Sequence, residues 1–398
     1  MTDITPRQAS GTGQQFLALD GWRGICAVFV ATMHLGATSH IADWRVVENA
    51  YLFVDFFFVL SGFVVTHAYI DRLRSTDDAA FMLWRRLGRL WPLHLAVLAG
   101  FIALELIVPL VAALTGVSRG AASAFDPGSS ALLSAVPTHV FLLQGFWIHD
   151  RLTWNAPSWS IGAEFWTYVV FAVVVVATRG RAVAVAITIA VLAAVAVAWL
   201  SKDYMATEHE FGFLRCLFGF FAGHLVYRAL QLRRLDLAMA SWIEGLAIAG
   251  LMGFVAYAGN TRFELAAPIV FGVVVWVFAH DQGVVSKLLQ CRPVQLIGLW
   301  SYSIYMVHSL WIAVLHRALT VLEQWTGHVL VHDVRGESGA MQMISFGNAS
   351  VMDAATVLYL IVLIGLSAMT WRWIEMPGQR YWNGTLWTAL AWRTAAVR

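Results

Sequence analysis

An arginine and a histidine stand eleven residues apart in an apolar stretch near the start of the chain. They are Arg23 and His34, in the segment LDGWRGICAVFVATMHLG. In an α-helix eleven residues turn through about 1100°, so both side chains project from one face, about 16 Å apart along the axis. A guanidinium binds anions, and an imidazole transfers protons near neutral pH. The pair therefore predicts a site for a long ligand, with its anionic end at Arg23 and its reactive end at His34.

Each member of this pair also has a structural explanation. Arg23 could extend its side chain to the inner lipid headgroups, and His34 could be a hydrogen-bonded structural histidine. Ionisable side chains inside a membrane are costly and are functional candidates by default. The shared helix face favours the functional interpretation of both residues.

Two carboxylates are expected at the depth of His34. Asp55 begins the segment DFFFVLSGF, and Glu164 lies about one turn into a helix that begins with SWSIGAEFW. A carboxylate beside an imidazole raises its basicity and fixes its tautomer. Asp55 and Glu164 are therefore candidate catalytic partners of His34. Ser61 and Gly62, which follow Asp55, are the small residues that permit close helix contact.

The segment LIGLWSYSIYMVHSLW (296–311) carries several hydroxyl groups and an imidazole. Ser301, Tyr305 and His308 follow i, i+4, i+7 spacing and share a helix face. His308 falls in the outer half of the helix as a candidate catalytic residue. Tyr305 or Ser303 could donate a hydrogen bond to a developing oxyanion. Hydrogen bonding between helices explains the same residues equally well.

Arg85, Arg86 and Arg89 form a cluster in WRRLGRLWPLHL (84–95). Guanidinium groups match phosphate oxygens two at a time, so the cluster predicts a phosphate site. The excess of positive residues on the cytoplasmic side of membrane proteins is the alternative explanation.

Three residues are candidates for the acceptor side of the site, Ser160, Trp159 and Ser303. Tryptophan rings in the outer connection 116–160 could stack on sugar faces. An interfacial aromatic belt is the competing explanation for the tryptophans, and helix capping is the competing explanation for Ser160.

The elements that must position these residues are membrane-spanning helices. The 398 residues are 59% hydrophobic and 13% charged, with a mean hydropathy of +0.68, whereas a soluble domain carries about 25% charged residues. A span needs about 20 mostly apolar residues, and long apolar runs without polar alternation exclude a membrane β-barrel. The sequence predicts an all-α polytopic membrane protein with about ten transmembrane helices, at 19–38, 51–70, 92–115, 161–178, 182–200, 211–230, 241–258, 265–280, 294–316 and 355–375.

The distribution of positive residues predicts the orientation. With the N-terminus in the cytoplasm, most of the 26 Lys and Arg residues fall in cytoplasmic segments, as the positive-inside rule requires. Both termini are therefore expected to be cytoplasmic. The expected organisation is a polar N-terminal segment (1–18), a membrane domain (19–378) and a cytoplasmic tail (379–398). The outer connection 317–354 is polar and glycine-rich and is expected to be mobile.

Charge and cysteine usage exclude other classes. The net charge of +2 is too small to suggest nucleic-acid binding, and the three cysteines form no CxxC pair. No metal-ligand spacing such as HExxH occurs, so no metal and no bound cofactor are expected. The oligomeric state is not indicated.

The chain resembles the acyltransferase-3 family of integral membrane acyltransferases. The matching pieces occur in the family's order across nearly the whole chain; they are LDGWRG with Arg23 and His34, DFFFVLSGF (55–63), RRLGRLWP (85–92), SWSIGAE (158–164), WSYSIYMVH (300–308) and RWIEMPGQR (372–380).

This resemblance implies an acyl-coenzyme A donor, with acetyl favoured, that is reached from the cytoplasm. Arg23 and the cluster of Arg85, Arg86 and Arg89 would hold the phosphate-bearing end of this donor, and His34 would be catalytic. Coenzyme A has a pantetheine arm on the order of the 16 Å helix rise, which would place the thioester near His34.

The acceptor implied by the resemblance is a hydroxyl on an extracytoplasmic or membrane-associated molecule, commonly a cell-envelope glycan, and the expected location is the bacterial inner (plasma) membrane. Glu164 matches the glutamate of the family's WSL-x-V-E stretch, although Phe165 and Trp166 replace the polar residues that usually follow. His34 could take the acceptor proton directly or form an acyl-histidine first. The alternatives are a multi-pass transporter or exporter of an anionic solute and a glycosyltransferase that uses a lipid-linked sugar.

Overall fold

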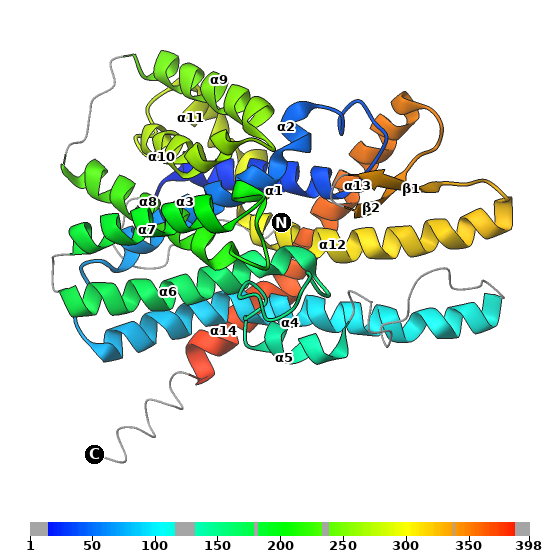
Figure 1. The fold of residues 1–398 in the computed structure, drawn as a ribbon, viewed down its shortest axis with the longest axis horizontal. Helices are drawn as coiled ribbons and strands as arrows, with labels where there is room; N and C mark the ends of the chain where they lie inside the picture. Colours follow the sequence, from blue (N-terminus) through cyan, green and yellow to red (C-terminus); the bar gives the residue numbers. More distant parts are fainter. Residues whose placement is uncertain (1–14, 116–131, 179–181, 233–238, 337–338, 387–398) are drawn as a thin grey trace, which may run out of the picture.

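The chain folds into a bundle of long helices, described by a computed structural model for residues 15–115, 132–178, 182–232, 239–336 and 339–386 (Figure 1). The predicted N-terminal segment lies mostly outside the described residues, as does the end of the predicted tail. The long helices are α1 (Leu17–His34), α3 (Phe53–Tyr69), α4 (Thr76–Thr115), α6 (Trp159–Thr178), α7 (Ala182–Leu200), α8 (Gly212–Leu232), α9 (Ala240–Ala258), α10 (Ala267–Phe278), α12 (Arg292–Thr326) and α13 (Ala349–Thr370).

Shorter elements connect these helices. They are α2 (Arg45–Glu48), α5 (Val136–Val140), α11 (Val284–Leu289), α14 (Met376–Tyr381), two π-helical segments (Trp371–Glu375 and Trp382–Leu386) and an antiparallel pair of strands, β1 (Val331–Gly336) and β2 (Gly339–Ile344).

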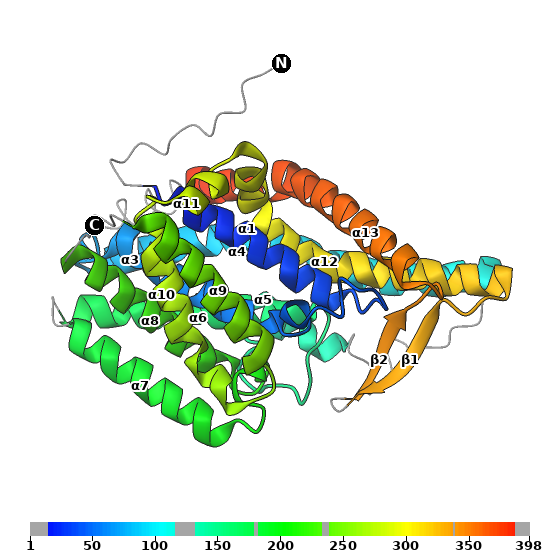
Figure 2. The ribbon, with the colours of Figure 1, turned by 90° about the horizontal axis from the view of Figure 1, so that it is seen from above.

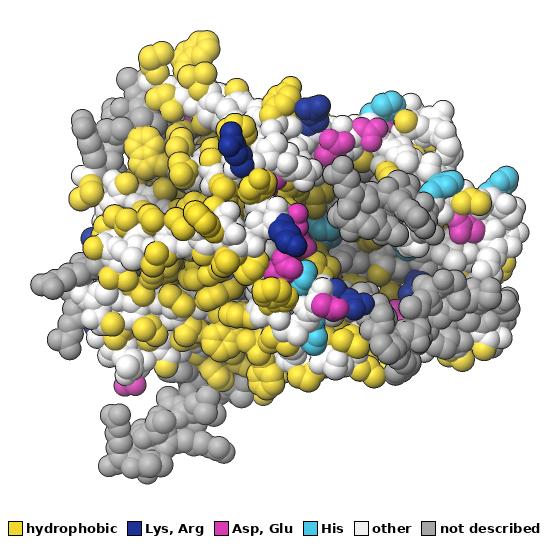
Figure 3. All heavy atoms as spheres, viewed as in Figure 1, with side chains coloured by type: hydrophobic (Ala, Val, Ile, Leu, Met, Phe, Trp, Pro, Cys, Tyr) yellow, Lys and Arg dark blue, Asp and Glu magenta, His cyan; other side chains and the backbone are white. Residues whose placement is uncertain are grey.

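The prediction of an all-α polytopic membrane protein is confirmed. Among the described residues, eight helices are long and apolar enough to cross a membrane. Of the ten predicted spans, α1 and α10 are formed as helices but are not among these eight. The first carries Asp20 and Arg23, and the second is only 12 residues long. Hydrophobic side chains cover the bundle on the left of Figure 3, whereas charged and histidine side chains gather around a hollow near its centre.

Helix α1 is positioned by a close contact with α12, which runs beside it in Figure 2. A Cβ atom added to Gly24 would lie 2.6 Å from the backbone nitrogen of Gly298. Glycine at both positions lets the two backbones approach. This contact fixes the helix that carries Arg23 and His34 against the helix that carries Ser301 and its neighbours.

Helix α3 is held against α8 in the same way. A Cβ atom on Gly62 would collide with the backbone oxygen of Phe220, and one on Gly223 would collide with that of Val59. The interpretation of Gly62 as a residue for close helix contact is therefore confirmed.

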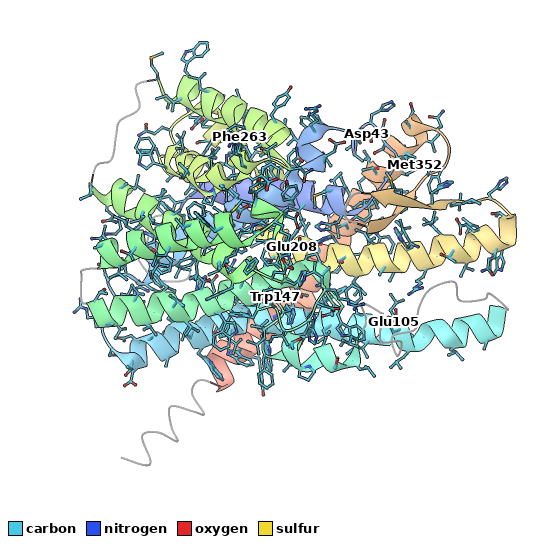
Figure 4. All side chains as sticks on the ribbon, viewed as in Figure 1. Asp43, Glu105, Trp147, Glu208, Phe263 and Met352 are labelled. Atoms are coloured by element: carbon cyan, nitrogen blue, oxygen red, sulfur yellow. The ribbon has the colours of Figure 1, made fainter. Side chains whose placement is uncertain are left out.

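Two helices extend well beyond their predicted spans. Helix α4 has 40 residues and α12 has 35, and both project to the right in Figures 1 and 2. An ion pair of 3.2 Å joins Arg317 of α12 to Glu105 of α4, the latter labelled in Figure 4. At its N-terminal end, α4 begins at Thr76, so Arg85, Arg86 and Arg89 all lie within this one helix.

The connection 317–354 contains the β1–β2 hairpin, which the sequence analysis did not predict. The backbone of Ile344 in β2 bonds to Gly36 and Thr38, just after α1 ends. Glu323 of α12 accepts hydrogen bonds from the backbone N–H groups of Leu330 and Val331. The hairpin is therefore fixed to both α1 and α12 on the side of the bundle where His34 lies.

The start of the predicted tail packs on α4. The ring of Trp382 lies 4.6 Å from that of Trp84 and 5.2 Å from that of Trp91, measured between centroids. Gly88 makes room for Trp382, because a Cβ atom there would collide with its ring. This segment supports the face of α4 beside the arginine cluster.

Candidate active site

A cavity of about 100 Å³ lies between α1, α3, α4, α6 and α12. It contains most of the predicted donor-binding arginines. Its lining residues are Arg23, Val54, Phe57, Phe58, Leu60, Ser61, Val64, Val65, Arg86, Arg89, Leu90, Ser160, Ile161, Glu164, Tyr168, Ser301, Tyr302 and Tyr305.

Arg23 is fixed at one end of this cavity by α12. Its Nε donates to the Oγ of Ser301 at 2.8 Å, and its Nη2 donates to the backbone oxygen of Gly298 at 3.0 Å. Asp20, one turn earlier on α1, lies 3.3 Å from Nη2. A guanidinium that is oriented in advance loses less entropy when it binds an anion.

The arginine cluster divides between the cavity and the exterior. Arg86 and Arg89 line the cavity with Arg23. The guanidinium of Arg86 lies over the ring of Tyr168 at 5.5 Å, and its Nε is buried without a hydrogen-bond partner in the described chain. Arg85 is exposed and lies over the ring of Phe81. Helix geometry separates Arg85 from Arg86, because neighbouring residues point about 100° apart, whereas Arg89 lies one turn further along α4 than Arg85.

Glu164 lies in the cavity among these arginines and is not hydrogen-bonded to His34. It accepts a hydrogen bond from Ser61 at 2.5 Å and another from the hydroxyl of Tyr168. Ser61 and Tyr168 are also within 2.9 Å of each other. The expected pairing of Glu164 with His34 is thus not formed; the hydroxyls of α3 and α6 both bond to the Oε1 atom of Glu164 instead.

Asp55 is likewise not placed beside His34. Both of its oxygens accept from Arg215 of α8, at 2.9 Å to Nε and 2.8 Å to Nη2. The side chains are 0% and 1% exposed, respectively. Trp159 lies under the guanidinium at 5.4 Å and is itself buried. Asp55 therefore belongs to a buried ion pair, and Trp159 packs in the interior instead of facing an acceptor.

Two hydroxyl groups close the end of the cavity opposite the arginines. The Oγ of Ser160 and the hydroxyl of Tyr305 are 2.8 Å apart, and each donates to the backbone oxygen of Pro157 at 3.0 Å. The Tyr305 ring contacts the rings of Phe57 and His308, with centroids 5.7 and 5.8 Å away. The predicted shared face of Tyr305 and His308 is present.

The two predicted histidines lie together. The rings of His34 and His308 are 5.0 Å apart between centroids. The Nδ1 of His34 donates to the carbonyl of Val30 at 2.9 Å, and that of His308 donates to Ile304 at 3.2 Å. A carbonyl only accepts, so Nδ1 carries the proton in each neutral ring and Nε2 has the lone pair. His34 is exposed, whereas His308 is fully buried.

Ser303 is not among the residues that line the cavity. Its Oγ donates to the Oε2 of Glu375 at 2.7 Å, and Glu375 ends the π-helical segment before α14. Ser303 is two residues from Ser301 and Tyr305, so it projects about 200° from each on the helix. Its position on the acceptor side stays a prediction, and the partner that the structure gives Ser303 is Glu375.

Four residues were missed by the sequence reasoning. Ser61 and Tyr168 hold Glu164, Arg215 holds Asp55, and Glu375 holds Ser303. An arginine within an apolar span is a usable signal for Arg215, since such a charge needs a buried partner. The choice of that partner depends on how α3 and α8 pack.

Among the described residues, no three His, Cys, Asp or Glu side chains are grouped so that they could hold a metal ion.

Comparison with known proteins assigns the chemistry. A family model described as an acyltransferase domain matches residues 16–372. The chain belongs to the acyltransferase-3 family. This membrane acyltransferase is similar to two curated proteins. Over 165 residues it is 33% identical to "Protein 2 in picA locus" of Rhizobium radiobacter, covering 40% of this chain and 82% of that protein.

The second relative aligns over most of the acyltransferase. It is "Acyltransferase MdmB" of Streptomyces mycarofaciens, 25% identical over 381 residues, which cover 88% of each protein. No solved structure shows significant similarity to the chain. Membership of this family means that the protein uses an acyl donor and an acyl acceptor, and it decides against the transporter and glycosyltransferase alternatives.

Proposed function

We propose that this acyltransferase moves an acetyl group from cytoplasmic acetyl-coenzyme A to a hydroxyl of an extracytoplasmic or membrane-associated acceptor, which we take to be a glycan of the bacterial cell envelope. In this proposal both termini are cytoplasmic and the protein resides in the inner membrane. The arginines of the cavity bind the phosphate-rich end of the donor, and the acceptor approaches His34 from the opposite side.

The observation that supports this proposal is an unbroken series of contacts from Arg23 to His34. Arg23 bonds to Ser301; one turn later Tyr305 closes the cavity; and the Tyr305 ring touches His308, which touches His34. An anion-binding end and an imidazole end are thus connected along one face of α12. Such an arrangement suits a donor with a charged head and a reactive thioester at the far end of a flexible arm.

His34 is the proposed general base. Its Nδ1 proton is engaged by Val30, so Nε2 is the acceptor of the proton. The acceptor oxygen forms a bond to the thioester carbonyl carbon while its proton passes to Nε2. The tetrahedral intermediate collapses with cleavage of the C–S bond, and the thiolate of coenzyme A takes the proton and leaves as the thiol. His308 packs against the ring of His34 and fixes its orientation.

Glu164 has a different proposed role from the one that its motif suggested. Held by Ser61 and Tyr168 among the arginines, it is placed to orient the donor arm in the cavity and not to assist His34. Asp55 supports the structure through Arg215, and the donor site consists of Arg23, Arg86 and Arg89 without Arg85.

The test is release of free coenzyme A from acetyl-coenzyme A by purified protein in lipid nanodiscs. We expect His34→Ala to abolish release and Arg89→Ala to raise the donor concentration needed for half-maximal rate. Arg85→Ala is the matched control, because it removes an equal charge from the same helix outside the cavity. Equal effects of the Arg85 and Arg89 substitutions would contradict the donor site, and full activity of His34→Ala would contradict the proposed base.

A further inference from the structure

The two histidines lie outside the lining of the donor cavity. Among the cavity's lining residues Tyr305 is the last on α12 in the direction of the histidines, and neither His34 nor His308 is part of the lining. The Tyr305 ring contacts the ring of His308, which in turn contacts the ring of the exposed His34. The Tyr305 side chain therefore stands between a cavity with three arginines and a histidine that is open to the surroundings.

Tyr305 is fixed in this position from several sides. Its hydroxyl bonds to Ser160 and to the backbone oxygen of Pro157, both at the start of α6. Its ring packs against Phe57 of α3, and the side chain is only 6% exposed. Each hydroxyl has a single proton, and both protons are engaged within the set formed by Tyr305, Ser160 and the Pro157 carbonyl, which is an acceptor within 3.0 Å of both hydroxyls. Tyr305 must break these bonds before it can donate to a substrate.

An acyltransferase whose donor and acceptor reach the site from opposite sides of the membrane must prevent hydrolysis of the donor. A thioester near a general base reacts with water as well as with an acceptor hydroxyl, giving acetate and free coenzyme A. Exclusion of water from the donor compartment prevents this loss. A side chain that closes the passage until it moves aside performs that exclusion.

We propose that the side chain of Tyr305 is the barrier between the donor cavity and the histidines. By closing this passage, it favours transfer of the acetyl group to the acceptor hydroxyl over transfer to water. The closed state is the one observed, with Tyr305 on Ser160 and Pro157. Rotation of Tyr305 opens the passage to His34 and frees its hydroxyl to donate to the thioester carbonyl. The use of acetyl-coenzyme A in this inference rests on the proposed function, whereas the existence of the barrier does not.

Site-directed labelling tests the barrier without any need for activity. Ser61 lines the cavity on the arginine side of Tyr305, so Ser61→Cys is the reporter. Cys291, the exposed native cysteine, is replaced with serine, while Cys26 and Cys216 are buried. A membrane-impermeant maleimide is added to one face or the other of sealed proteoliposomes.

With Tyr305 present, we expect the reporter to be labelled from one face only. Tyr305→Ala should allow labelling from both faces, and Tyr305→Phe, which keeps the ring but loses both hydrogen bonds, should allow slower labelling from the second face. Tyr302→Ala is the matched control. It removes a tyrosine that lines the same cavity but bonds to Leu90 of α4, so labelling should stay one-sided.

A second readout is the hydrolysis of acetyl-coenzyme A without acceptor. We expect Tyr305→Ala to raise this hydrolysis at least fivefold over that of the parent protein. The barrier would be overturned if the reporter in the parent protein were labelled from both faces or from neither face. It would also be overturned if a folded Tyr305→Ala protein were labelled from one face only. If no variant uses acetyl-coenzyme A but labelling changes as expected, the barrier stands and the proposed donor is wrong.

Discussion

Replacing Asp55 with alanine tests whether this carboxylate is structural or catalytic. The carboxylate of Asp55 accepts two charge-assisted hydrogen bonds from Arg215, of 2.8 and 2.9 Å, inside the bundle. Without it the guanidinium keeps the backbone oxygens of Thr207 and Tyr51, the ring of Trp159 and the electrostatic attraction of Glu208 and Glu264, to which it has no direct ion pair. Removing one partner of a buried ion pair costs about 3–5 kcal/mol, because the remaining buried charge loses its directly bonded partner. The exposures of 0% and 1% mean that solvent does not screen this loss.

The assay is thermal unfolding of the purified protein in detergent, followed by tryptophan fluorescence. We expect Asp55→Ala to lower the melting temperature by on the order of 10 °C. The double variant Asp55→Leu with Arg215→Met removes both charges and keeps the volume, and it should recover most of the stability. It should also recover most of the thioester cleavage.

Two results would refute this reasoning. One is an Asp55→Ala protein with unchanged melting temperature, which would mean that the pair contributes nothing to stability. The other is a double variant that is stable but inactive, which would return Asp55 to the catalytic role suggested by its sequence position.

Three further predictions concern other parts of the molecule. Arg89→Ala should raise the KM for acetyl-coenzyme A about 10- to 100-fold, since a hydrogen bond to a charged group contributes about 1.5–3 kcal/mol, whereas Arg85→Ala should leave steady-state KM unchanged. Gly62→Ala should lower the melting temperature more than any exposed helix substitution, because its Cβ would collide with the backbone of α8; an unchanged melting temperature would show that the helices can separate. The exposed His40 lies 2.8 Å from Asp353, and this contact raises the pKa of the imidazole above its usual 6.5. The contribution of this contact to stability is therefore fully present below pH 6.5 and is lost as pH rises through the raised pKa of His40; pH-dependent melting should lose this component in Asp353→Asn.

The long helices, and the polar residues that share a face of α1 or of α12, could be predicted from the sequence. The apolar runs located the long helices because burial in a bilayer requires about 20 apolar residues in succession. The spacing of Arg23 and His34, and of Ser301, Tyr305 and His308, placed each set on one face because helix geometry depends only on the residue number. These patterns were local, and the structure retains them.

The partners of the buried charges could not be predicted in this way. Asp55 and Glu164 both lie at the expected depth, yet one is bound by Arg215 and the other by Ser61 and Tyr168. Depth is set by position along a helix, whereas partnership depends on how each helix is rotated and which neighbour it meets. Those choices follow from close contacts such as that of Gly62 with α8, which involve residues more than 150 positions apart.

The sequence by itself therefore determined a membrane acyltransferase with an arginine and a histidine at opposite ends of one helix face. Only the tertiary structure decided that three of the four arginines share a cavity, that the carboxylates serve other partners, and that Tyr305 stands between the cavity and the histidines. The physical reason is that periodicity fixes a side chain's direction within its own helix, while the packing of helices fixes what lies in that direction.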